Sequence, residues 1–136
     1  MNKTIIRKIT FGFICLSALA MFAISCRDDN EPANHTLKFE IKGNYTGNLK
    51  ATITYGSMDN VNAEAEDVEK LTWTKSVDVK GEYAMGIGAM TWDKSGKKGE
   101  KITIKMYVDG KEVKSTMATA DNDGDIMSNL IQYSGK

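Results

Sequence analysis

Apolar and polar residues alternate with a period of two through much of the chain after residue 36. Half-buried β-strands have this pattern, because successive side chains of a strand point to opposite faces of the sheet. The alternation is regular in three segments, which we predict to be strands: 37–42, 49–55 and 71–79. In the third segment Trp73 shares the apolar face, so we predict that it packs in the core.

Two further strands carry apolar residues in less regular patterns. Residues 82–90 are apolar on both alternating faces, which predicts a central strand. Gly86 and Gly88 within it predict a bulge or close packing against a neighbouring strand. A final strand is predicted over residues 126–133, after a turn rich in Asp, Asn and Gly.

The segment between the second and third predicted strands has no clear period. Residues 57–69 are acidic, and Ala and Glu are frequent within residues 61–70. Because Ala and Glu are good helix formers, a short helix is one interpretation of this segment. A long loop between two strands is the other.

A hairpin is predicted around Asp109-Gly110, which separates the alternating segments 102–108 and 111–117. This dipeptide tolerates the positive φ angles of a two-residue type I′ turn. The hydrophobic pattern then sets the register, since a slip of one residue would move every side chain to the other face. Counting back from the turn pairs apolar residues with each other: Met106 with Val113 and Ile102 with Met117.

In total the chain carries about seven predicted strands over about 100 residues, with turn residues between them. Two packed antiparallel sheets satisfy that pattern better than a barrel does. We therefore predict an all-β sandwich over residues 37–136.

The first 25 residues have the organisation of a secretory signal peptide. Positive charges at Lys3, Arg7 and Lys8 precede an uncharged apolar stretch over residues 9–25. This stretch of 17 residues is short for a hydrocarbon core of about 30 Å. An uncleaved membrane helix is the alternative interpretation, and the residues that follow must decide.

Residues 23–26, Ala-Ile-Ser-Cys, resemble a lipobox, the processing signal of bacterial lipoproteins. The acidic run over residues 28–31 resembles the surface-export signal of Bacteroidota lipoproteins. These resemblances imply cleavage before Cys26, acyl chains on that residue and a position at the cell envelope, with the outer membrane and its surface as the expected location. Two or more acyl chains anchor a protein stably without a membrane helix. Residues 26–36 are polar and are predicted to be a flexible, lipidated tether.

Composition excludes several classes of function. Without residues 1–25 the chain has 15 basic and 18 acidic residues, a net charge of −3, whereas nucleic-acid binders carry a concentrated basic face. Nucleic acid is therefore excluded as a partner. Cys15 and Cys26 are the two cysteines of the chain, so no disulfide and no zinc site built from Cys is predicted in the domain.

The cluster Asp121, Asp123 and Asp125 is the candidate for metal binding. It matches the first positions of an EF-hand loop, but that loop needs Gly at its sixth position and Glu at its twelfth. Here these positions hold Ile126 and Gln132. We therefore predict a tight turn between strands and no bound cofactor, with irregular calcium binding as the alternative.

Catalytic patterns are absent from the sequence. His35 is the single histidine and lies in the predicted tether, where a solvated linker residue cannot orient a nucleophile. We therefore predict that the protein is not an enzyme. Trp92 is the candidate binding residue, because it follows an apolar strand and precedes polar residues. There it is either exposed for stacking on a sugar or lipid, or packed at the edge of the core.

Three segments together resemble the small β-sandwich domain of the MmpS family of membrane accessory proteins: residues 51–55, 71–75 and 104–111. The middle segment commonly reads Leu-Pro-Trp-Ser-Lys in that family, and Thr72 stands here in place of the Pro. The resemblance implies an immunoglobulin-like sandwich. For mycobacterial members it also implies partnership with large exporters.

These observations predict a non-catalytic, lipid-anchored binding or accessory module at the cell envelope. Its expected partners are the membrane, through the lipid, and an envelope protein, glycan or transporter. The alternative is a structural or adhesin-like surface component that contacts its neighbours through strand edges.

Overall fold

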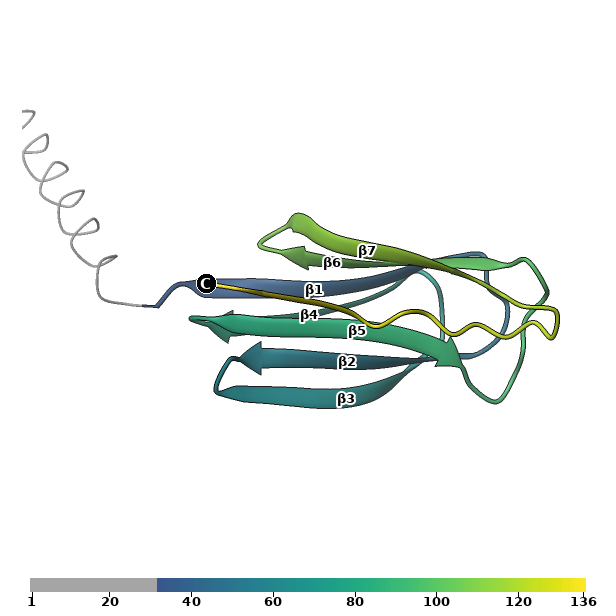
Figure 1. Ribbon diagram of the computed structural model, residues 1–136, viewed down its shortest axis with the longest axis horizontal. Helices are drawn as coiled ribbons and strands as arrows, with labels where there is room; N and C mark the ends of the chain where they lie inside the picture. The colour runs from purple at the N-terminus through teal and green to yellow at the C-terminus, as the bar shows by residue number, and fades with distance from the viewer. Residues whose placement is uncertain (1–31) are drawn as a thin grey trace, which may run out of the picture. The chain divides into compact units, whose positions relative to one another are not determined.

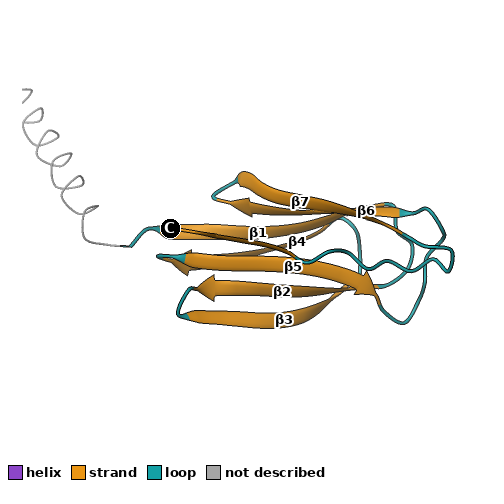
Figure 2. Ribbon diagram, in the orientation of Figure 1, coloured by secondary structure: helices purple, strands orange, loops and turns teal. Residues whose placement is uncertain are grey.

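The computed structural model describes residues 32–136 and contains eight β-strands in two four-stranded antiparallel sheets (Figures 1 and 2). Their order is β4-β1-β6-β7 in one sheet and β3-β2-β5-β8 in the other. The strands are β1 (Asn34–Gly43), β2 (Leu49–Ser57), β3 (Asn60–Val68), β4 (Trp73–Lys80), β5 (Tyr83–Thr91), β6 (Lys101–Val108), β7 (Lys111–Thr119) and β8 (Ile131–Gly135). The predicted antiparallel sandwich is thus confirmed, with eight strands instead of seven.

The hydrophobic core lies between the sheets and consists mainly of the alternating apolar residues. The largest fully buried side chains come from β1, β2, β5 and β6: Leu37, Phe39, Ile41, Ile53, Met85, Ile87, Ile102, Ile104 and Met106. Trp73 is partly buried and packs against this cluster from β4. The period of two therefore identified the core because each sheet has one buried and one exposed face.

The first strand begins earlier than the sequence predicts. β1 starts at Asn34, so the last three residues of the predicted tether belong to the sheet. His35 pairs with Val79 of β4, and its Nδ1 donates a hydrogen bond to Oδ2 of Asp109 at 2.8 Å. The imidazole is only 12% exposed, so the predicted solvated linker histidine is wrong. Backbone pairing with β4 extends the strand into a polar sequence.

The acidic segment after β2 is neither a helix nor a loop but the strand β3. It pairs with β2 from Leu49↔Val68 to Ser57↔Asn60. Its Glu64 accepts a hydrogen bond from Lys75 Nζ of β4 at 2.7 Å, and Glu66 accepts a second one from the same group. Charged pairs thus replace apolar contacts where two edge strands meet, and this explains why the segment lacks an apolar period.

The predicted hairpin forms, but most of its predicted register is wrong. Asp109 and Gly110 have φ angles of 51° and 82°, as a type I′ turn requires. A bulge follows, since Tyr107 pairs with Glu112 while Met106 pairs with Lys114. The extra residue turns every later side chain to the other face. The observed partners are therefore Lys114 for Met106 and Ala118 for Ile102, and Met117 is 62% exposed.

The central strand is confirmed, and the last strand is shorter than predicted. β5 lies between β2 and β8, and a Cβ added at Gly86 would come within 2.7 Å of Thr54 Oγ1. Close packing, and not a bulge, therefore requires that glycine. β8 begins at Ile131. In the preceding irregular stretch, pairing with β5 is reduced to the isolated bridge Met90↔Met127, and the Ser128 hydroxyl accepts a hydrogen bond from the Ala89 amide at 2.8 Å.

Among residues 32–136 no helix is long and apolar enough to cross a membrane. The predicted signal peptide and the lipidation of Cys26 lie outside the described residues.

Candidate functional site

The two ends of the sandwich differ in the length of their connections (Figure 1). The chain enters the domain at the end that we call the turn end, where strands are joined by two-residue turns: 58–59, 81–82 and 109–110. We call the other end the loop end. It carries the longer connections: 44–48, 69–72, 92–100 and 120–130. Trp92 and the Asp121–Asp125 turn, which the sequence singled out, both lie at the loop end.

Tyr45 joins three of these loops from a buried position. It is 6% exposed, and its hydroxyl donates to the Gly124 carbonyl at 2.7 Å. The same oxygen accepts from the Gly96 amide at 3.1 Å and lies 2.7 Å from Thr91 Oγ1. Sequence reasoning missed this residue, although a lone aromatic within a polar turn sequence is a signal for such an anchor.

Glu100 ties two of the loops together with its carboxylate. It accepts hydrogen bonds from the Lys97 amide at 3.0 Å and the Thr46 amide at 2.9 Å. The Thr46 hydroxyl donates to the same group. These hydrogen bonds, first that from Lys97 and then that from Thr46, hold the pKa of Glu100 below its ordinary value.

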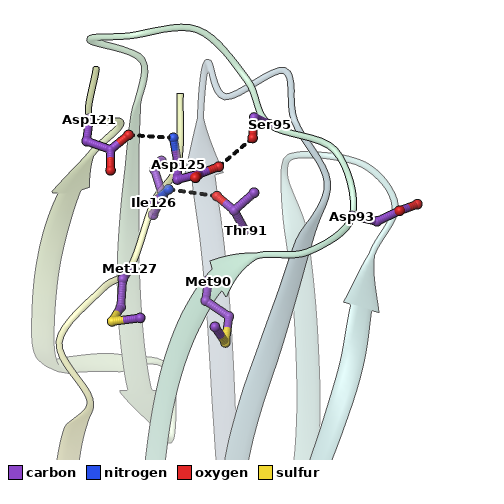
Figure 3. Close-up of a pocket in the computed structure, with 8 residues that line it drawn as sticks. All are labelled: Met90, Thr91, Asp93, Ser95, Asp121, Asp125, Ile126 and Met127. Carbon is purple, nitrogen blue, oxygen red and sulfur yellow. Dashed lines mark hydrogen bonds between the residues drawn. The ribbon is translucent and has the colours of Figure 1, made fainter. Parts of the chain in front are cut away.

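A cavity of about 440 Å³ opens at the loop end between β5 and the 120–130 loop (Figure 3). It is lined by Met90, Thr91, Asp93, Ser95, Asp121, Asp125, Ile126 and Met127. The polar groups near it are largely bonded to each other. The Ser95 hydroxyl donates to Asp125, and Thr91 Oγ1 accepts from the Ile126 amide at 2.7 Å. Asp93 points away from the other side chains in the figure.

The predicted turn at Asp121–Asp125 is confirmed. Asp121 Oδ1 accepts hydrogen bonds from the backbone amides of Asp123 at 2.9 Å and Asp125 at 3.0 Å. The Gly124 amide donates back to the Asp121 carbonyl. In the part of the chain that the structure describes, no three His, Cys, Asp or Glu side chains are grouped as metal ligands. The carboxylate of Asp121 thus serves the turn itself.

Trp92 is exposed and borders a second hollow of the loop end. Its side chain is 53% exposed, so of the two predicted positions the structure has the exposed one. The Lys50 Nζ lies 4.1 Å from the centroid of the indole ring and 3.5 Å from Asp67 Oδ1. The cleft beside the ring measures about 390 Å³ and is lined by Asn48, Leu49, Asp67, Val68, Glu69, Trp92 and Asp93.

No family model and no curated protein matches the chain. Among solved structures it is similar to a domain of unknown function, DUF4425, from Bacteroides vulgatus ATCC 8482, with 14% identity and a TM-score of 0.48 over 78% of this chain and 97% of that chain. It is also similar to a DUF4425 family protein from Bacteroides ovatus ATCC 8483, with 14% identity and a TM-score of 0.46 over 76% and 95% of the two chains. Neither description names a ligand or an activity.

Proposed function

We propose that this protein is a non-catalytic, lipid-anchored module of the bacterial envelope that binds its partner through the loop end. The observation that carries the proposal is the exposed Trp92 at the end opposite to the one where the chain enters the domain. Cys26 precedes the first strand by eight residues. An anchor there would tie the turn end to the membrane and leave the loop end free for contact.

The carboxylates that hold the loops together and the single histidine take part in structural hydrogen bonds, which supports binding over catalysis by these groups. Acid–base catalysis needs a titratable group that is free to reach a substrate. Glu100 instead accepts hydrogen bonds from the amides of Lys97 and Thr46, and Asp121 accepts one from the amide of Asp123. His35 is bonded to Asp109 at the turn end, away from both hollows of the loop end.

The strand-edge alternative has less support. Strand addition needs an open row of backbone groups on an edge strand. Lys75 links β4 to two carboxylates of β3, which ties these edge strands of the two sheets together. On the opposite side Lys114 Nζ of β7 donates to the Gln132 carbonyl of β8 at 2.9 Å. Side-chain contacts therefore brace both sides of the sandwich, and a strand added at either edge would have to pass them.

The resemblance to the MmpS family concerns mainly the strands of the domain, with residues 71–72 as its part of the loop end. Its three segments fall in and around β2, β4 and the β6–β7 hairpin. Within the proposal, the resemblance suggests an accessory role at the envelope. There the domain would act beside an exporter, a surface protein or a glycan. The partner itself must be sought with residues of the loop end.

The test uses the full chain in a bacterium that processes lipoproteins. Cys26→Ser should lose fatty-acid labelling and membrane partitioning, since a serine oxygen cannot form the thioether. A photo-crosslinking residue at position 92 should capture an envelope component on intact cells. The same residue at position 58 is a matched control at the turn end, because Met58 is 54% exposed and Trp92 is 53% exposed.

Two results would overturn the proposal. One is a Cys26→Ser protein that is still processed and still partitions into membranes like the parent. The other is crosslinking of the same partners with equal yield from positions 58 and 92.

A further inference from the structure

We propose that the cleft beside Trp92 binds a neutral glycan, with a pyranose ring stacked on the face of the indole that Lys50 leaves free. The inference rests on the proposed binding function and names the class of its ligand. It depends on three properties of the cleft, namely an oriented aromatic platform, a rim of hydrogen-bonding groups and the sign of the local charge.

The indole of Trp92 is held in place before any ligand arrives. Lys50 Nζ lies over one face of the ring at 4.1 Å from its centroid, a cation–π contact. The Trp92 amide donates to the Asn48 carbonyl at 2.8 Å, which fixes the backbone beneath the side chain. A platform that is already ordered loses little conformational entropy on binding.

The indole is also not needed for the core. The buried cluster and the side chains packed against it include Trp73 but not Trp92. A large aromatic side chain that stays half exposed keeps its apolar surface available for a ligand with an apolar face of its own. The C–H face of a pyranose ring has the size and the polarity for such a contact.

The rim of the cleft supplies groups that suit sugar hydroxyls. Asn48, Asp67, Glu69 and Asp93 line it together with the indole. Carboxylates accept hydrogen bonds from hydroxyl donors, and an amide side chain both donates and accepts. Ligand sites commonly combine an apolar surface with a few such polar groups that fix orientation. A ring with an apolar face and a hydroxyl edge fits this combination.

The charge of the cleft distinguishes among ligands. Three carboxylates and one ammonium group surround the indole, so a phosphate or uronate ligand would meet net repulsion. A cationic ligand on the free face would lie across the ring from the Lys50 ammonium, which repels it and already interacts with the same π system. A neutral polyol can bind without displacing Lys50 from the ring and without meeting repulsion from the carboxylates.

Affinity electrophoresis of the detergent-solubilised full chain tests the inference. The gels contain a neutral polysaccharide (mannan, starch, β-glucan or arabinoxylan), and gels with polygalacturonate serve as the anionic comparison. We expect retardation in at least one neutral gel and none with polygalacturonate. Trp92→Ala should weaken this binding by about tenfold or more, the loss of one stacking contact. Met58→Ala should leave it unchanged, and Trp92→Phe should restore part of it.

Unaltered thermal unfolding of Trp92→Ala would show that the loss is local. The inference is overturned if no neutral polysaccharide retards the protein, if Trp92→Ala binds like the parent, or if polygalacturonate binds equally well. Such a failure leaves the broader proposal standing when position 92 still captures an envelope component on cells, so the two can fail separately.

Discussion

The turn end and the loop end of the sandwich are stabilised in different ways. At the turn end each chain reversal takes only two residues, and the positive φ angles of Asp109 and Gly110 suit such a reversal. At the loop end the backbone is held by side chains from distant positions, above all Tyr45 and Glu100. A recognition surface needs irregular backbone on a firm support, and the loop end is where this chain provides one.

Both ends nevertheless use a carboxylate in the same way. Asp109 accepts from His35 and from the Thr36 amide at 2.9 Å, and Glu100 accepts from the amides of Thr46 and Lys97. These bonds lower the pKa of Asp109, chiefly through His35, as they lower that of Glu100. At both ends these carboxylates also reach distant parts of the chain, so the ends differ in the length of their connections and in packing, not in chemistry.

Two glycines with similar φ angles, one at each end, can separate the cost of backbone strain from the cost of close packing. We expect the larger loss of stability at the loop end. Gly124 and Gly110 have φ angles of 79° and 82°. A Cβ at Gly124 would come within 2.1 Å of the Gly96 carbonyl oxygen, whereas a Cβ at Gly110 meets nothing within 4 Å. We expect Gly110→Ala to lose about 1 kcal/mol of unfolding free energy and Gly124→Ala about 3 kcal/mol or more.

Urea unfolding followed by fluorescence measures both losses. Equal losses in the two variants would mean that the close approach of the two loops at Gly124 contributes nothing to stability, and the contrast between the ends would fail.

Removing the Tyr45 hydroxyl should have the next largest effect. Tyr45→Phe keeps the ring but removes the hydrogen bonds of the hydroxyl. The Gly96 amide and the Gly124 carbonyl still bond to each other at 2.9 Å, so we expect a cost of about 1 kcal/mol. The control is Tyr107→Phe, since that hydroxyl bonds to Glu40 at 3.2 Å on the outer face of its sheet. We expect a drop in Tm of about 4 °C or more for Tyr45→Phe and little change for the control. Similar drops in both variants would contradict the anchoring role of Tyr45.

Acidification should remove the contribution of Glu100, the smallest of the three effects. A carboxylate whose pKa is lowered by folding stabilises the protein above its unfolded pKa, here near 4.5. That stabilisation is lost as the pH falls through the lower folded value. The stability difference between the parent and Glu100→Gln should therefore be complete above pH 4.5 and should close below it.

Chemical denaturation between about pH 6 and about pH 3 measures this difference directly. A difference between the parent and Glu100→Gln that stays constant across the whole range would show that the ionised form of Glu100 is not what holds the loops.

The sequence by itself determined the elements whose cause is local. Alternation identified β1, β2 and β4, because a strand with one buried face must place apolar residues at every second position. The pair Asp109-Gly110 identified its turn because these residue types tolerate positive φ. The position of Trp92 at the end of a strand was also readable. The signal peptide and the lipidation of Cys26 remain predictions from sequence.

Only the tertiary structure decided the features that depend on a partner strand or loop. β3 is a strand because β2 pairs with it and because Lys75, from the other sheet, neutralises two of its carboxylates. The bulge between Met106 and Tyr107 decided which side chains of β7 face the core. The contacts of Tyr45 join loops that are far apart in the sequence. Whether Trp92 is exposed or packed also depends on how the other loops fold around it. Periodicity reports the surroundings of one strand, whereas these contacts join residues far apart in the chain.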